Sequence, residues 1–76
     1  MPHVIVTLYS GKSERQKQAL AQAVTEAATS ALNYGEASVS VGIEDVEPKD
    51  WTEQVYEHDI IGKPDTIYKK PGYGPR

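Results

Sequence analysis

A chain of 76 residues without cysteine makes one small domain that neither disulfides nor thiolate metal sites can stabilise, which leaves self-association as the remaining source of stability. Its eight basic and eleven acidic residues give a net charge of −3, which argues against nonspecific nucleic acid binding, since that depends on clustered cations. No apolar run approaches the roughly 20 residues of a membrane span, and the first residues lack a signal-peptide pattern, so we expect a soluble cytoplasmic protein.

The first predicted element is a strand over residues 2–9, which is rich in β-branched and aromatic residues. Apolar side chains alternate along it and share one face: Val4, Val6 and Leu8. The opposite face carries a mixed set of side chains: His3, Ile5, Thr7 and Tyr9. Because Ile5 is apolar, we expect both faces to be partly covered, as in a parallel sheet or at a subunit interface.

A helix is predicted over residues 14–33. Ser13 and Gln16 have the spacing of a capping box at its start, and Gly35 is placed to end it. Apolar residues recur at helical spacing and predict one buried, alanine-rich face: Leu20, Ala23, Val24, Ala27, Ala28, Ala31 and Leu32. The polar residues between them are expected to face solvent: Gln18, Gln22, Thr25, Glu26 and Thr29.

A second strand is predicted over residues 38–46, where Val39, Val41 and Ile43 alternate with small or polar side chains. Two strands joined by a long helix make a β-α-β unit of the α/β class, with parallel strands. Both edges of such a two-stranded sheet are open, which is a hazard for a monomer. We therefore expect two chains to pair edge to edge as a homodimer, with a four-stranded sheet and helices on one face.

The rest of the chain continues the single domain, residues 1–76, without a linker. Trp51, Val55 and Tyr56 have loosely helical spacing, which predicts a short helix over about residues 49–59. Gly62 and Pro64 break this pattern, and residues 62–76 are predicted to form an irregular tail.

The sequence lacks most of the groups on which active sites depend. It has no cysteine nucleophile, no glycine-rich phosphate loop and no metal-ligand cluster, since His3 and His58 stand alone. Pro2 is the exception, because removal of Met1 would leave a secondary amine at the start of a strand. An α-amino group titrates near pH 8, and desolvation or nearby cations lower its pKa towards the range of an effective general base. Taken alone, a proline here is more often an ordinary strand-edge residue.

Beyond these patterns, the sequence resembles the 4-oxalocrotonate tautomerase family over nearly its whole length. The resemblance rests on segments in the same order and at the same spacing: Met1-Pro2, Gly11-Lys12-Ser13-Glu14-Arg15-Gln16-Lys17, Ala37-Ser38-Val39-Ser40-Val41 and Trp51. His3 and the tail segment Lys69-Lys70-Pro71-Gly72-Tyr73 are most similar to the dimeric, PptA-like branch of that family. The resemblance implies a β-α-β subunit that uses no cofactor and no metal.

The resemblance also implies a reaction and a site. In the family the amino-terminal proline moves a proton between oxygen and carbon of an enol and its keto form, so Pro2 is expected to be the base. Lys12 stands where the family usually has an arginine, and Trp51 where it has an aromatic residue in the pocket. Ser40 stands where the classical dicarboxylate-processing members have a second arginine. With fewer cations, the expected substrate is a small enol monocarboxylate, such as an aryl enolpyruvate.

These residues are too far apart to meet within one chain. Pro2 begins the first strand and Lys12 follows its far end, about 25 Å away at about 3.3 Å per residue. Trp51 lies beyond the far end of the second, parallel strand. If two subunits pair antiparallel, the partner's Lys12 and the partner's Trp51 come back to Pro2. We therefore expect an active site shared across a homodimer, and the long tail favours a dimer over a trimer of dimers.

Other residues and functions stay open. Arg15, His3 and a tail tyrosine, Tyr68 or Tyr73, are further candidates for substrate contact. Relatives that dehalogenate or decarboxylate unsaturated acids use the same proline with an activated water, and no arginine pair or glutamate is clearly placed for that here. A non-catalytic assembly or ligand-binding protein with the same fold is the third interpretation.

Overall fold

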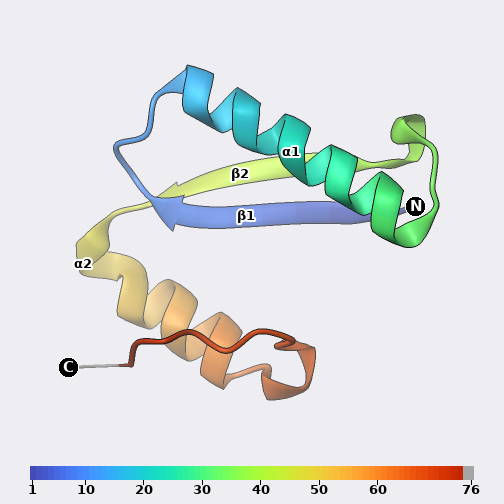
Figure 1. Ribbon diagram of the computed structural model, residues 1–76. Helices are drawn as coiled ribbons and strands as arrows, with labels where there is room; N and C mark the ends of the chain where they lie inside the picture. Colours follow the sequence, from blue (N-terminus) through green and yellow to red (C-terminus); the bar gives the residue numbers. More distant parts are fainter. Residues whose placement is uncertain (75–76) are drawn as a thin grey trace.

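The computed structural model describes residues 1–74 (Figure 1). In chain order the elements are β1 (His3–Tyr9), α1 (Glu14–Leu32), a 3-10 turn (Glu36–Ser38) and β2 (Ser40–Val46). A short helix α2 (Pro48–Trp51) follows and continues with π-helical hydrogen bonding over Thr52–Ile61, and a 3-10 turn (Pro64–Thr66) lies in the tail. No helix in this part of the chain has both the length and the hydropathy of a membrane span.

The two strands form a parallel sheet, with pairs running from His3 opposite Ser40 to Tyr9 opposite Val46. The helix α1 lies across one face of this sheet and packs against β2, so the predicted β-α-β fold is confirmed (Figure 1). An ion pair ties the helix to that face, because the Lys17 amine lies 2.6 Å from the Asp45 carboxylate.

Local hydrogen bonds fix both ends of α1. The predicted capping box is present: the Ser13 hydroxyl accepts from the Gln16 amide at 3.1 Å, and the Gln16 side chain accepts from the Ser13 amide at 3.1 Å. The helix ends at Leu32, within one residue of the predicted end, but the residue that ends it is not Gly35. Asn33 forms the C-cap with φ 60°, in the left-handed region that asparagine tolerates, and its amide donates to the Thr29 carbonyl.

The buried face of α1 is rotated from the predicted one. Ala23, Ala27 and Ala31 are exposed, and the half-buried face takes in the two threonines that were expected in solvent: Lys17, Leu20, Ala21, Val24, Thr25, Ala28 and Thr29. The threonines tolerate this position because each hydroxyl donates to a helix carbonyl, Thr25 to Ala21 at 2.8 Å and Thr29 to Glu26 at 2.9 Å.

The remaining boundaries differ from the predicted ranges by a few residues. The second strand begins at Ser40 because the three residues Glu36–Ser38 turn first, with the Ser38 amide donating to Gly35. The predicted helix over 49–59 begins at Pro48 and extends to Ile61, where the Gly62 amide donates back to Glu57. The expected irregular tail contains a 3-10 turn, and its last two residues, 75–76, lie outside the described residues.

The chain is flat, with extents of 40 × 31 × 18 Å. Its accessible surface is 5,975 Å², whereas a compact monomer of this mass exposes about 4,600 Å². Among residues 1–74, Val55 is the one hydrophobic side chain that is almost fully buried, at 7% exposure. Ile5 and Tyr9, on the sheet face opposite α1, are both 52% exposed. The single chain therefore exposes more surface than a compact monomer of its mass.

Candidate functional site

The amino end of the sheet holds Pro2 beside a polar pair. Pro2 is half-buried, and its carbonyl accepts a hydrogen bond of 3.2 Å from the amide of Ser40, the first residue of β2. The next residue, His3, places its Nδ1 atom 2.6 Å from the Ser40 hydroxyl. The parallel pairing of β1 with β2 creates this contact between residues 37 positions apart, so three residues singled out from the sequence lie together here.

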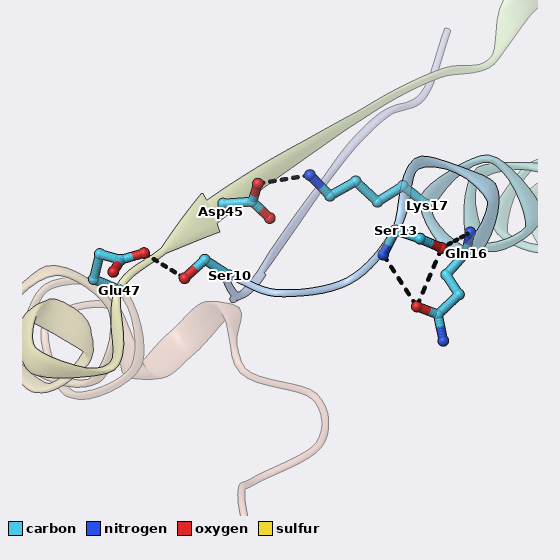
Figure 2. A network of polar contacts seen from close by, with 6 residues as sticks. All are labelled: Ser10, Ser13, Gln16, Lys17, Asp45 and Glu47. Carbon is cyan, nitrogen blue, oxygen red and sulfur yellow. Dashed lines mark hydrogen bonds and ion pairs between the residues drawn. The ribbon is translucent and has the colours of Figure 1, made fainter.

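The opposite end of the sheet holds Lys12 in the loop between β1 and α1. Figure 2 shows the contacts of Ser10 and Ser13 on either side of it. Before it, the Ser10 amide donates to the Val46 carbonyl at 3.1 Å, and the Ser10 hydroxyl donates to the carboxylate of Glu47. After it, Ser13 caps α1. Gly11 adopts φ 120°, in the left-handed region that favours glycine, which lets the chain turn between these contacts.

Lys12 itself is exposed, and within residues 1–74 it forms no ion pair. Arg15, in the first turn of α1, is exposed as well and forms no ion pair in this part of the chain. Lys17 differs, since its hydrogen bond to Asp45 raises the pKa of its amine. Two cations at this end therefore remain available to an anion, and the third is bound into the fold.

Trp51 lies at the same end of the sheet, at the last position of α2. The ring of Tyr9 meets it edge to face, with 5.0 Å between ring centroids. Its indole N–H donates to the Tyr73 hydroxyl at 3.1 Å, and the Tyr73 ring lies 5.7 Å from that of Tyr56. The other tail candidate, Tyr68, is 98% exposed. The tail therefore contributes one tyrosine, Tyr73, to an aromatic cluster around Trp51.

The sequence did not single out Tyr9 as a neighbour of Trp51. A signal was available, because Tyr9 ends the first strand and the carboxyl ends of parallel strands lie at the same edge of a sheet. The contact with Tyr73 depends on the path of the tail, for which residues 62–73 give no periodic signal.

One chain does not bring Pro2 together with Lys12 or Trp51. Figure 1 shows the amino terminus at one end of the sheet and the β1–α1 loop at the other. Each end thus carries part of the predicted site: the imino acid, a histidine and a serine at one, and a lysine and an aromatic cluster at the other. In the described residues no three His, Asp or Glu side chains are grouped to hold a metal ion.

Comparison with known protein families points to one kind of enzyme. The sequence model of a family described as "Tautomerase enzyme" matches residues 2–55. A protein of Xylella fastidiosa strain 9a5c named "Probable tautomerase" is 40% identical over 97% of this chain and 90% of its own length. Tautomerase PptA of Cronobacter sakazakii is 38% identical over 96% of this chain and 97% of its own length.

Solved structures give the same result. The crystal structure of TomN, a 4-oxalocrotonate tautomerase homologue of the tomaymycin biosynthetic pathway, matches with a TM-score of 0.64 and 36% identity, over 66% of this chain and 77% of TomN. A heterohexamer 4-oxalocrotonate tautomerase from Chloroflexus aurantiacus J-10-fl matches with a TM-score of 0.66 and 35% identity, over 71% of this chain and 87% of that one.

Proposed function

The chain belongs to the tautomerase family, and we propose that it is a cofactor-independent keto–enol tautomerase whose general base is the amine of Pro2. The observation that carries the proposal is that the family match begins at Pro2, the half-buried residue in front of β1. With Met1 attached, the ring nitrogen is a tertiary amide and has no basic lone pair. Removal of Met1 would make it a secondary amine.

The chemistry requires one base that both takes and returns a proton. The amine of Pro2 accepts the proton of the enol hydroxyl and delivers a proton to the carbon at the other end of the double bond, so the substrate isomerises and the enzyme is unchanged. Pro2 is half-buried in front of β1. The ring also holds the lone pair in one direction, which supports proton transfer at a fixed position.

The cations available to the substrate indicate its charge. The negative charge that develops on the enolate oxygen and the substrate carboxylate require positive partners. Lys12 supplies one, as a single point charge that cannot grip a carboxylate with two parallel bonds. At the other end, the Ser40 hydroxyl is hydrogen-bonded to His3 and adds no charge. We infer a small monocarboxylate, such as an aryl enolpyruvate, in preference to a diacid.

Two subunits would complete the site. The excess surface of the single chain and its exposed Ile5 and Tyr9 support self-association, and one structural neighbour is described as a heterohexamer. Antiparallel pairing across a sheet edge would place the partner's Lys12 and the partner's Trp51 beside Pro2. We therefore propose a homodimer with two equivalent shared sites.

The test of the proposal is the replacement of Pro2. Protein whose intact mass shows that Met1 is absent should convert phenylenolpyruvate to its keto form. The reaction is monitored by the loss of the enol's ultraviolet absorbance. Pro2→Ala should lower kcat/KM about 10²- to 10⁴-fold, the usual contribution of a general base. Full activity in this variant would refute the mechanism.

Protein that retains Met1 is the matched control, since it keeps every side chain and blocks only the amine. Its circular dichroism should equal that of the processed protein while its activity is lost. Release of halide from 3-haloacrylates by the processed protein would instead identify a dehalogenase. Failure to turn over any enol acid would favour a non-catalytic role.

A further inference from the structure

A cavity of about 220 Å³ lies between the π-helical segment and the tail, which runs back along that segment (Figure 1). We call it the tail pocket, and these residues line it: Tyr56, Ile60, Pro64, Ile67, Lys70, Pro71 and Tyr73. Neither Pro2 nor Lys12 is among them. The pocket is thus lined by residues other than Pro2, Lys12 and Trp51, although its Tyr73 contacts Trp51.

The lining combines apolar walls with one cation. Tyr56 and Tyr73 are tilted against each other at 43°, and the other neutral lining residues are isoleucines and prolines. Lys70 is the only charged residue in the lining, and no carboxylate within residues 1–74 pairs with its amine. A ligand that fits this environment is apolar over most of its surface and carries one negative charge.

The volume limits the size of that ligand. A cavity of about 150 Å³ holds a benzene molecule, and the tail pocket is larger than this but below the usual volume of about 300 Å³ or more for drug-sized ligands. One aromatic ring with a short side chain fits the available space. Flat aromatic walls favour a ring over a branched aliphatic group, because aromatic pairs attract beyond their buried area.

We propose that the tail pocket binds an aromatic monocarboxylate, with the ring against Tyr56 and Tyr73 and the carboxylate paired with Lys70. Binding here would also affect the aromatic cluster around Trp51, at the carboxyl end of the sheet. The Tyr73 hydroxyl, which belongs to a lining residue, accepts the hydrogen bond from the indole of Trp51. A ligand that moves the Tyr73 ring therefore changes the surroundings of Trp51.

The chain provides its own reporter, because Trp51 is its single tryptophan. Titration with 3-phenylpropanoate, which has no enol to react, should change Trp51 fluorescence in a saturable way. Lys70→Gln should weaken this binding about fivefold at most, as expected for one exposed ion pair. Lys69→Gln is the matched control: it removes the neighbouring charge, which does not line the pocket, and should leave the dissociation constant unchanged.

Two further variants separate the tail pocket from the proposed active site. Binding should survive Pro2→Ala and Lys12→Gln, since neither residue lines the tail pocket. Tyr73→Phe should retain binding, measured by ligand-observed NMR, and lose most of the fluorescence response. The proposal is wrong if 3-phenylpropanoate does not bind, if Lys69→Gln and Lys70→Gln weaken binding equally, or if Lys12→Gln alone abolishes it, which would place the ligand beside Lys12.

Discussion

The two ends of the sheet differ in what they contain and in how they are held. The amino end has Pro2, His3 and Ser40, with one backbone and one side-chain hydrogen bond between them. The carboxyl end has Trp51 in an aromatic cluster and Lys12 in a loop between Ser10 and Ser13, whose contacts Figure 2 shows. Within residues 1–74, the proposed base lies at one end, and the proposed cationic and apolar contacts lie at the other. On the proposed mechanism, neither end would act on an enol acid alone.

Subunit mixing tests whether the two ends of the sheet act together, and it has the largest expected effect. Pro2→Ala and Lys12→Gln homodimers should each lose at least 90% of wild-type activity, because each lacks one half of both sites. In a mixed dimer one site regains an intact Pro2 and an intact Lys12, and the other carries both changes. Random mixing makes half of the dimers mixed, so the mixture should recover about a quarter of wild-type activity.

The measurement is the tautomerase rate after the two variants are unfolded together and refolded at equal concentrations. The two variants refolded separately and then combined on ice serve as the control. If the mixture shows no recovery while each variant is dimeric by sedimentation, the two ends do not meet across a dimer.

Removal of the aromatic anchor is the next largest expected effect. Trp51→Ala deletes a half-buried ring that contacts Tyr9 and Tyr73, and should lower the free energy of unfolding by about 2 kcal/mol. Tyr68→Ala is the control, since its ring is 98% exposed and its removal should cost less than about 0.5 kcal/mol. Urea unfolding followed by circular dichroism, at one fixed protein concentration, measures both. Equal stability losses would show that the cluster does not hold the carboxyl end.

Replacing one serine at each end of the sheet with alanine tests how the two ends differ. Ser10→Ala removes the hydroxyl that bonds Glu47 and should destabilise the fold by about 1 kcal/mol. Ser40→Ala frees His3 at the amino end, where the strands are paired in any case, and should change kcat/KM more than stability. The measurements are urea unfolding and phenylenolpyruvate turnover for both variants. The opposite outcome, with Ser40 stabilising and Ser10 affecting turnover, would reverse the roles given to the two ends.

The sequence predicts the order of elements well because each has a local signal. Alternating valines mark β1 and β2, and Ser13 with Gln16 marks the start of α1. The buried face of α1 was less predictable, because alanines occur on several sides of the helix and give little contrast in hydropathy. The exposed Ala23 and half-buried Ala21 illustrate this.

Contacts across the fold depend on strand register and on the path of the tail, neither of which has a local signal. His3 meets Ser40 only because β1 and β2 pair in one register, and Trp51 meets Tyr73 only because the tail folds back. Tertiary packing therefore decides what a side chain touches, even where the sequence decides which element it occupies. The sequence identified Pro2, Lys12 and Trp51 as candidates. The structure adds the neighbours of Pro2 and of Trp51.

The smallest expected effect concerns the ion pair that ties α1 to the sheet. Folding raises the pKa of the Lys17 amine above its ordinary value of 10.5, chiefly through the hydrogen bond from Lys17 to Asp45. The folded chain therefore holds this proton more tightly than the unfolded chain. The stability that the ion pair contributes is fully present below pH 10.5 and is lost as the pH rises through the higher pKa of the folded state.

Lys17→Met keeps most of the side-chain length and removes the charge. The stability difference between wild type and Lys17→Met should stay constant from about pH 7 to 9 and shrink above about pH 10.5. Lys49→Met, which alters a more exposed pair 3.5 Å apart, should show no such change, and a similar pH dependence in both variants would assign the effect to net charge instead of the Lys17–Asp45 contact.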